Sequence, residues 1–427
     1  MIHGLDAGEN GGGSTPRLGS VEGVRGYLAL WVVACHAMWA SGYEPAMLSG
    51  LPKLLRQGDL AVEVFVIISA FVIFMLLDTK RMSFGQFIVR RFFRLFPLFI
   101  ALFIVAIPIS RVSLWNVTHA AAYLTPQHID HQVLRIESWW QNLQWHVPLH
   151  LVMLQGAVPE GLLQDSPGAF LDPAWSVSLE WQFYLIAPLA FGLAVSVRPF
   201  RRIALILACA LLFLGSTRLL PPVRYGAALP FHIEYFALGA VSYFVYKRYA
   251  GRARAAMPFL VGCFLAVLLV SAGGEARFRL VPVALWIAFL GLILEHRSTF
   301  SWRIASSLFT NRVALRLGRV SYSIYLSHML LLAVIQHALL RWAPELSRGA
   351  HFSILLALTT AATITASLFL YRYLEAPGIW AGRALGNRLS GGYQPARLPR
   401  AGRPGRAATT LDGLGFTARS MDDSRPA

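Results

Sequence analysis

The sequence predicts an all-α polytopic membrane protein with about ten transmembrane helices around a central cavity. Of its 427 residues, 56% are hydrophobic and only 14% are charged, whereas a soluble domain carries about 25% charged residues. Apolar runs of about 20 residues recur along the chain, and this is the length that a helix needs to cross a bilayer. The runs predict helices over residues 22–41, 59–78, 85–109, 176–197, 202–219, 230–248, 257–273, 280–295, 314–340 and 352–374.

Basic residues in the short loops predict the orientation of these helices. The loops after even-numbered helices contain Lys80, Arg81, Arg198, Arg201, Arg202, Lys247, Arg248, Arg252, Arg254, Arg297, Arg303, Arg312 and Arg316. Cytoplasmic loops are enriched in Lys and Arg, so we expect a multi-pass protein of the inner (plasma) membrane with both termini in the cytoplasm. The net charge of +17 then follows from topology. Nucleic acid is not an expected partner, because no soluble basic domain exists to bind it.

The two ends of the chain are polar and lack apolar periodicity. We expect a disordered cytoplasmic tail over residues 1–20, a membrane domain over 21–377, and a disordered basic cytoplasmic tail over 378–427. All three cysteines fall in predicted helices, at Cys35, Cys209 and Cys263. An odd number of buried thiols argues against a disulfide framework.

Two ionisable residues, Arg25 and His36, lie in the first apolar run. An ionisable group inside a membrane costs roughly 2.5–3.5 kcal/mol on insertion scales, so it indicates a functional site by default. Eleven residues correspond to about three helical turns, which places both side chains on one face about 16 Å apart. The alternative is an Arg that reaches the interface and a His that is hydrogen-bonded inside the bundle.

Two carboxylates, Glu63 and Glu180, stand in otherwise apolar helices. A buried carboxylate must find a partner or become protonated, and Arg25 and His36 are the expected partners of Glu63. A purely structural ion pair is nearly as plausible there. Glu180 is expected to face an acceptor or to orient an imidazole, although it also fits a capping box at the start of its helix.

Arg91 and Arg94 begin the third predicted helix at its cytoplasmic end. Residues three apart share a helix face, and two guanidinium groups on one face can bind phosphate in a bidentate manner. We therefore expect a phosphate-bearing cytosolic substrate to bind there. Taken alone, the cluster also fits a basic anchor at the membrane surface.

A polar stripe marks the ninth predicted helix. Tyr322, Tyr325 and His328 follow one another at intervals of three residues, and they line a cavity or join two helices by hydrogen bonds. Trp175 and Ser176 at the start of the fourth helix are expected to line the same cavity or acceptor site.

The segment 111–174 between the third and fourth helices contains several histidines and tryptophans. They are His119, His128, His131, His146, His150, Trp139, Trp140 and Trp145. No metal site is expected, because Pro148 disturbs the helix face that His146 and His150 would share as ligands. The tryptophans fit the membrane interface, or stacking on a sugar-like acceptor.

Taken together, these motifs resemble the membrane acyltransferase-3 family. They are Glu22–Gly26 with His36, Val62–Phe65 with Ser69, Arg91–Pro97, Trp175–Tyr184, Ser321–His328 and Tyr373–Pro377. The resemblance runs from about residue 22 to 377 and keeps the family's order. The chain departs from the pattern at Ala70, Phe96 and Trp181, where Gly, Tyr and a second Glu are usual; Glu63 stands where Asp is usual.

The resemblance implies an O-acyltransferase whose donor is acyl-CoA, most often acetyl-CoA, with no tightly bound cofactor. Arg25, Arg91 and Arg94 would hold the donor phosphates, and His36 would act as general base on an acceptor hydroxyl or carry the acyl group. An imidazole with an ordinary pKa of about 6.5 suits this work. Glu63 or Glu180 would orient the imidazole. Direct attack and a two-step route through acyl-His36 both remain open.

The implied acceptor is a carbohydrate, a lipid-linked molecule or a small molecule, and the sequence predicts no oligomeric state. A membrane transporter that uses the buried charges as a proton or anion pathway is the main alternative. A non-catalytic scaffold, which would tolerate loss of His36, is a further one.

Overall fold

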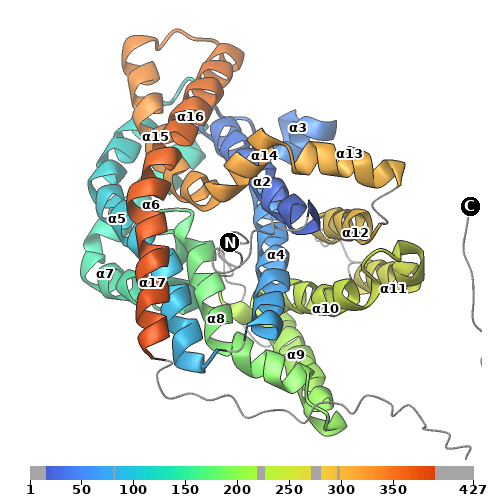
Figure 1. Ribbon diagram of the computed structural model, residues 1–427. Coiled ribbons are helices and arrows are strands. Elements are labelled where there is room, and N and C mark those ends of the chain that lie inside the picture. Colours follow the sequence, from blue (N-terminus) through green and yellow to red (C-terminus); the bar gives the residue numbers. More distant parts are fainter. Residues whose placement is uncertain (1–15, 81, 219–226, 271–279, 296–298, 390–427) are drawn as a thin grey trace, which may run out of the picture. The chain divides into compact units, whose positions relative to one another are not determined.

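The computed structural model describes residues 16–80, 82–218, 227–270, 280–295 and 299–389, and these residues form helices joined by turns and short loops, without a strand (Figure 1). The helices are α2 (Pro16–Ala40), α3 (Gly50–Leu55), α4 (Gly58–Thr79), α5 (Phe84–His119), α6 (Pro126–Gln141), α7 (Leu143–Leu151), α8 (Ala174–Ala194), α9 (Pro199–Arg218), α10 (Ile233–Tyr249), α11 (Ala253–Val270), α12 (Leu280–Leu294), α13 (Phe300–Phe309), α14 (Arg312–Arg319), α15 (Ser321–Trp342), α16 (Arg348–Leu370) and α17 (Ala376–Arg388). Each of the ten predicted ranges contains a helix.

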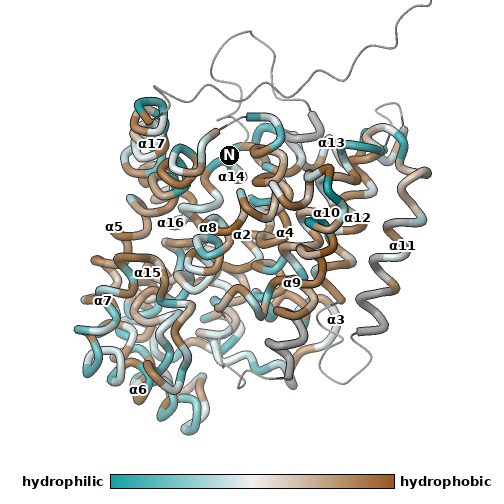
Figure 2. The backbone as a smooth tube through the Cα atoms, turned by 90° about the horizontal axis from the view of Figure 1, so that it is seen from below, coloured by the Kyte–Doolittle hydropathy of each residue, from teal (hydrophilic) through white to brown (hydrophobic). Residues whose placement is uncertain are grey.

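Five helices among the described residues are long and apolar enough to cross a membrane. They are α4, α5, α8, α15 and the continuous stretch Arg348–Arg388; α12 is apolar but shorter. Ten crossings are therefore not confirmed. The helix that contains Arg25 and His36 is not among the five, because these side chains lower its mean hydropathy. Figure 2 shows apolar backbone along α4 and α5, with α13, α14 and α17 near one end and α6 near the other.

Helix α4 lies at the centre of the packed helices, where it contacts α2, α8, α10 and α12. Most of its residues are buried, and no polar face is left for solvent or headgroups. This burial explains why its sequence reads as an almost continuous apolar run rather than an amphipathic one. The helix thereby supplies wall residues to every cavity described below.

The predicted helix over 314–340 is in fact two helices, α14 and α15, which meet at Val320. Next to this break, α14 approaches α2 closely: a Cβ atom at Gly318 would lie 1.9 Å from the backbone oxygen of Glu22. The backbone of α2 at Gly23 lies equally close to α13: a Cβ atom at this position would be 1.8 Å from the backbone oxygen of Phe309. The apolar pattern alone did not reveal this break.

The last predicted helix also differs from the structure. Helix α16 ends at Leu370, continues through a π-helical turn at Tyr371–Glu375 and then becomes α17. Residues 378–388 were expected in a disordered tail, but they belong to α17, which packs along α5. Three buried glycines at intervals of four residues, Gly378, Gly382 and Gly386, give α17 a flat face for this contact. Residues 390–427 of the expected tail and 1–15 of the first tail lie outside the described residues.

The third predicted helix is longer than expected. Helix α5 runs for 36 residues, or about 54 Å, which exceeds the hydrocarbon thickness of about 30 Å. Its N-cap is Ser83, whose hydroxyl accepts a hydrogen bond from the backbone of Gln86. Beyond α5, the segment up to residue 174 folds into α6, α7 and two short 3₁₀ turns. This segment brings side chains of α6 toward α2.

Candidate active site

Three pockets follow one another along α4, and each takes a different part of that helix as a wall. Val72, Leu76 and Lys80 line the first, with a volume of about 250 Å³. Phe65, Val66 and Ser69 line the second, of about 50 Å³. Asp59 and Glu63 line the third, of about 540 Å³. We call them the basic, the narrow and the aromatic pocket.

Helix α2 lines the same three pockets in the same order. Glu22 lies at the basic pocket, Arg25 at the narrow pocket, and His36 at the aromatic pocket. The narrow and aromatic pockets share Val62 and Tyr325 as walls. Because two neighbouring helices pass the pockets in the same order, the three pockets lie one after another along α2 and α4.

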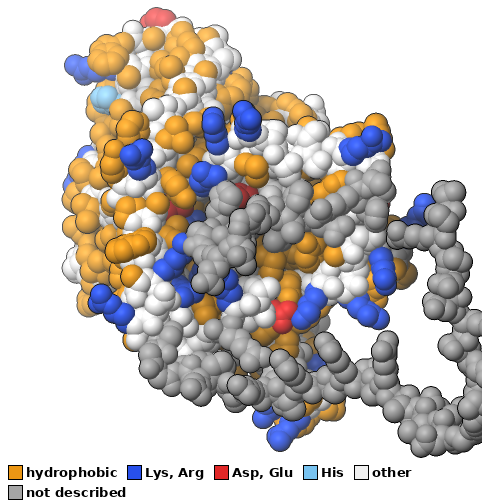
Figure 3. Space-filling model, in the orientation of Figure 1, with side chains coloured by type: hydrophobic (Ala, Val, Ile, Leu, Met, Phe, Trp, Pro, Cys, Tyr) orange, Lys and Arg blue, Asp and Glu red, His pale blue; other side chains and the backbone are white. Residues whose placement is uncertain are grey.

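The basic pocket is lined by six cationic side chains and two carboxylates. The cationic residues are Lys80, Arg90, Arg91, Arg94, Arg319 and Arg383. In the orientation of Figure 1, Figure 3 shows Lys and Arg side chains scattered over the face where α13, α14 and α17 lie in front, with few Asp or Glu side chains among them. Such a pocket attracts anions, because its positive charges far outnumber its negative ones.

Arg91 and Arg94 are held differently inside the basic pocket. Nη1 of Arg94 lies 2.8 Å from Oε1 of Glu375, and the other oxygen of Glu375 accepts a hydrogen bond of 2.7 Å from Ser323. The guanidinium of Arg91 lies 5.9 Å from the ring centroids of Phe87 and Tyr184, and its Nε and Nη1 atoms are buried without a hydrogen-bond partner among the described residues. Arg91 thus has donors available for a ligand.

The narrow pocket has one polar and one apolar wall. On the polar side, Oε1 of Glu180 accepts hydrogen bonds from Ser69, at 2.7 Å, and from Tyr184. Arg25 attracts this carboxylate electrostatically and lies 5.5 Å from the ring centroid of Phe65. The half-buried Glu180 is therefore paired, as a carboxylate with little access to water must be.

His36 lies in the aromatic pocket, beside a second histidine. Its ring centroid is 5.1 Å from that of His328, whose Nδ1 lies 2.6 Å from the backbone oxygen of Tyr325. Trp39, Trp139 and Trp175 line the same pocket. The pocket combines an imidazole with flat apolar surfaces, which suits a ring-shaped molecule that carries hydroxyl groups.

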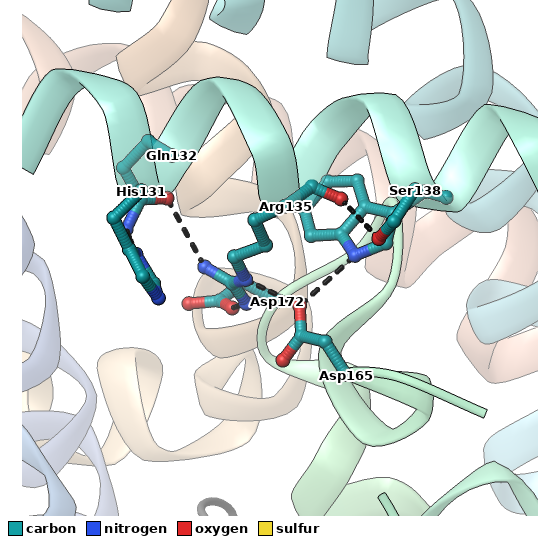
Figure 4. A network of polar contacts seen from close by, with 7 residues as sticks. His131, Gln132, Arg135, Ser138, Asp165 and Asp172 are labelled. Carbon is teal, nitrogen blue, oxygen red and sulfur yellow. Dashed lines mark hydrogen bonds and ion pairs between the residues drawn. The ribbon is translucent and has the colours of Figure 1, made fainter. Parts of the chain in front are cut away.

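An acidic network faces His36 from the segment between α5 and α8. Arg135 of α6 forms ion pairs with Asp165 and Asp172; Nη2 lies 2.6 Å from Oδ1 of Asp172 (Figure 4). Burial raises the pKa of Asp172, but the opposing effects of Arg135 and, more weakly, of His36 and His328 hold it below its ordinary value. Asp172 is therefore a carboxylate at neutral pH, in the same pocket as His36.

Comparison with known proteins decides the family. The model of the acyltransferase domain family matches residues 18–372. The chain belongs to this acyltransferase family. The enzyme is therefore a transferase, and the family resemblance of its motifs is confirmed.

Two curated relatives carry names of the same kind. Acyltransferase MdmB of Streptomyces mycarofaciens is 30% identical over 188 residues, which are 44% of this chain and 42% of the relative. A putative acetyltransferase, ORF330, of Acidianus two-tailed virus is 23% identical over 320 residues, 72% of this chain and 81% of the relative. The match with the first relative thus spans less than half of its length. No solved structure matches.

The structure separates residues that were expected to act together. Arg25 was expected beside Arg91 and Arg94, but it lines the narrow pocket, whereas they line the basic one. Glu180 was expected to face an acceptor or to orient an imidazole; its carboxylate accepts hydrogen bonds from Ser69 and Tyr184, and it lines the narrow pocket and not the aromatic one. Glu63 does line that pocket with His36.

The polar stripe of α15 divides among the pockets. Tyr322 lines the narrow pocket, and its hydroxyl donates a hydrogen bond of 2.9 Å to the backbone of Leu95. Tyr325 lines both the narrow and the aromatic pocket, and its hydroxyl accepts a 2.9 Å hydrogen bond from Ser176. His328 is buried behind His36 and lines none of the three pockets. The stripe serves both cavity lining and helix packing.

Asp172 and Arg135 were not predicted as site residues. Asp172 lies three residues before the motif Trp175–Tyr184, and this position in front of a functional helix was the available signal. The sequence contains no comparable signal for Arg135, because this residue lies in a segment without a family motif.

The histidines of α7 are packed in the protein interior. His146 packs against Phe170 and His150 against Phe103. Burial lowers the pKa of His146 to about 4 and that of His150 to about 3. No group of three metal-binding side chains forms in the part of the chain that the structure describes.

Proposed function

We propose that this acyltransferase moves an acyl group, above all acetyl, from cytosolic acyl-CoA to a hydroxyl of a carbohydrate-type or small-molecule acceptor. The observation that carries the proposal is the series of pockets, with a basic pocket at one end and His36 in a large aromatic pocket at the other. Donor and acceptor would enter from opposite ends of the series and meet near the narrow pocket.

The basic pocket supports an anionic donor such as acyl-CoA. Arg91 and Arg94 offer guanidinium donors that match phosphate geometry, and only Arg94 is already paired with a carboxylate, Glu375. Both arginines line a pocket of about 250 Å³, whereas a basic anchor at a membrane surface needs no pocket. In this arrangement Arg25 lies further along the series, where it would meet the thioester end of the donor rather than its phosphates.

In the proposed reaction, His36 removes the proton from the acceptor hydroxyl. The hydroxyl oxygen then attacks the thioester carbonyl carbon, so that a C–O bond forms and the C–S bond breaks. The CoA thiolate leaves and takes up the proton from the imidazolium. In a two-step route, His36 itself would attack the thioester and pass the acyl group to the hydroxyl. The carboxylate of Asp172 favours the positively charged imidazole in either route.

The acceptor side supports a ring-shaped polyhydroxylated molecule. Trp39, Trp139 and Trp175 offer flat apolar faces, and Gln132 and Gln336 offer amides that can hydrogen-bond to hydroxyl groups. The pocket of about 540 Å³ falls in the size range of ligand sites for small molecules. Lipid-linked sugars and macrocyclic molecules share this chemistry.

The test is acyl transfer from radiolabelled acetyl-CoA by the purified full-length protein in liposomes, with an acceptor extract. We expect His36→Ala to lose transfer while it still binds CoA. His119→Ala is the matched control, because His119 is exposed on α5 and lines none of the pockets. Undiminished CoA release by His36→Ala would refute the role of His36. Solute flux without acyl transfer would favour a transporter instead.

A second measurement separates the two routes. Without acceptor, a two-step enzyme accumulates acid-labile label on the protein, and the label requires His36. A direct enzyme accumulates none and releases CoA only when acceptor is present. Both variants of the reaction use the same pockets, so this measurement distinguishes the chemistry without changing the site.

A further inference from the structure

We infer that His328 is a positioning residue for His36: its Nε2 atom accepts a hydrogen bond from the His36 ring and so decides which nitrogen of His36 faces the acceptor hydroxyl. The inference rests on the proposed function, because it takes His36 as the base or acyl carrier. Three observations carry it: the distance between the two rings, the hydrogen bond at Nδ1 of His328, and the buried acceptor at its Nε2.

His328 lies on α15, directly behind the ring of His36 on α2. The two ring centroids are 5.1 Å apart and the ring planes are inclined by 43°. Helices α2 and α15 are in contact, so the pair is held by helix packing rather than by a loop. His36 lines the aromatic pocket, whereas His328 is fully buried and does not. His328 therefore acts on a molecule in the pocket only through His36.

The hydrogen bond at Nδ1 fixes the tautomer of His328. Nδ1 lies 2.6 Å from the backbone oxygen of Tyr325, three residues earlier on the same helix. A carbonyl oxygen only accepts, so Nδ1 carries the hydrogen and Nε2 of the neutral ring is an acceptor. Nε2 is buried and has no donor among the described residues. A buried acceptor without a donor is unfavourable, and an N–H group of His36 would satisfy it.

The ring of His36 offers the matching donor. It forms no hydrogen bond or ion pair with another residue in the described ranges. A neutral imidazole carries its hydrogen on one nitrogen and a lone pair on the other, and the bond made by the N–H group selects which is which. An N–H group turned toward His328 leaves the lone pair for the acceptor hydroxyl. Catalytic hydrogen bonds are often long in free enzymes and tighten when substrate binds.

The nearby carboxylates are less suited to hold this hydrogen. Asp172 and, more weakly, Asp59 act on His36 electrostatically, without a hydrogen bond. Asp172 is already paired with Arg135 at 2.6 Å, and Asp59 is exposed at the start of α4. A charge acting from a distance stabilises the imidazolium but does not select one of its two nitrogens.

Two amides at position 328 test the inference in the full-length protein in liposomes, with acetyl-CoA and an acceptor extract. The amide of His328→Asn can replace Nδ1–H and keep the bond to Tyr325, but it leaves no acceptor at Nε2. The longer side chain of His328→Gln places its amide oxygen near Nε2 and gives up the bond at Nδ1.

His328→Asn should lower kcat by about tenfold or more and leave KM for acetyl-CoA within about twofold, because general-base catalysis depends on the correct nitrogen. His328→Gln should keep kcat within about threefold of the wild type. A purely structural role of the bond to Tyr325 predicts the reverse order. His337→Asn on the same helix is the matched control: His337 contacts Asn116 and lines none of the three pockets, so both constants should stay unchanged.

A second measurement needs no acyl transfer. Diethyl pyrocarbonate modifies neutral imidazoles, and peptide mass spectrometry gives the rate of this modification at His36. A hydrogen bond from its N–H group makes the other nitrogen more basic. His328→Asn should therefore slow the modification of His36 by about threefold or more, whereas His328→Gln should leave the rate near that of the wild type.

Equal kcat values in the two variants, or a lower value in His328→Gln, would overturn the inference while leaving the acyltransferase function intact. Loss of transfer in Glu63→Gln but in neither variant of His328 would assign the positioning role to that carboxylate instead. If the wild type itself transfers no acyl group, the proposed function fails. The modification rates then still decide the inference, because equal rates at His36 in all variants would refute an effect of His328.

Discussion

Arg94 on α5 forms a buried ion pair with Glu375, at the end of the π-helical turn that joins α16 to α17. The two side chains are 9% and 1% exposed, so neither charge is solvated by water. π-Turns are rare and are frequent at functional sites. Here the turn brings a carboxylate of the last described segment to the basic pocket and fixes the position of one of its arginines.

We therefore predict that Glu375→Ala destabilises the protein by about 3–5 kcal/mol, because it leaves a buried charge unpaired. The measurement is chemical or thermal unfolding in detergent. Lys247→Gln is the control. Lys247 forms an ion pair with Asp78, but the Lys247 side chain is 57% exposed, and an ion pair at the surface contributes only about 0–1 kcal/mol to stability. Equal losses of stability in the two variants would contradict a special role for the buried pair.

Arg91→Ala should weaken donor binding. The unpartnered Nε and Nη1 atoms of Arg91 are available to a phosphate, and a hydrogen bond to a charged group contributes about 1.5–3 kcal/mol. The expected result is a rise of about 10- to 100-fold in KM for acyl-CoA with a smaller change in kcat.

Arg312→Ala serves as the control for donor binding, because it removes an exposed positive charge outside the pocket. It should leave KM within about twofold, since exposed charges are largely screened by salt. If both variants raise KM equally, general attraction of anions to this face explains donor binding, and the specific role of Arg91 is wrong.

Acidification should destabilise the network around Arg135 through Asp172. The pKa of Asp172 is held below its ordinary value, against burial, chiefly by Arg135. Its contribution to stability is therefore complete above the unfolded-state pKa of about 3.9 and is lost as the pH falls through the lower, folded-state pKa. Asp172→Asn should lower the unfolding temperature at pH 7 and flatten its dependence on pH below about 4.

Asp165 provides the opposite case in the same network. Burial outweighs the ion pair with Arg135 and raises its pKa above the ordinary value. Ionisation of Asp165 therefore costs more free energy in the folded than in the unfolded protein. The stability that its protonated form contributes is fully present below the unfolded-state pKa of about 3.9 and is lost as the pH rises through the folded-state pKa. Asp165→Asn should consequently cost less stability at pH 7 than Asp172→Asn. A larger loss for Asp165→Asn would show that its hydrogen bond from Trp139 matters more than its charge.

The glycine contacts of α2 should be sensitive to a single methyl group. In Gly23→Ala the new Cβ would lie 1.8 Å from the backbone oxygen of Phe309, so α2 and α13 must move apart. We expect a loss of stability of at least about 1–3 kcal/mol from overpacking. Gly192→Ala in α8 is the control, because nothing lies within 4 Å of its Cβ position. It should be neutral or stabilising by about 0.4–1 kcal/mol.

The helices and the family were accessible from the sequence because both depend on local patterns. Apolar runs placed a helix in each of the ten expected ranges, and ordered motifs identified the acyltransferase family before any contact was known. The register of Arg25 and His36 on one helix also followed from spacing alone. Helix ends were less accessible: the break at Val320 lies beside the contact of Gly318 with Glu22, and these segments are far apart in the chain.

The composition of the site was decided by tertiary structure. Spacing along α2 did not show that Arg25 and His36 line different pockets, because the division is made by side chains of α4, α8 and α15. Nothing in the sequence near His36 indicates Asp172, which lines that pocket and is paired there with Arg135 of α6. Local sequence thus determined the helices and the type of chemistry, whereas the pairing of charges depended on which helices pack together, because ion pairs form between side chains that only folding brings within a few ångströms.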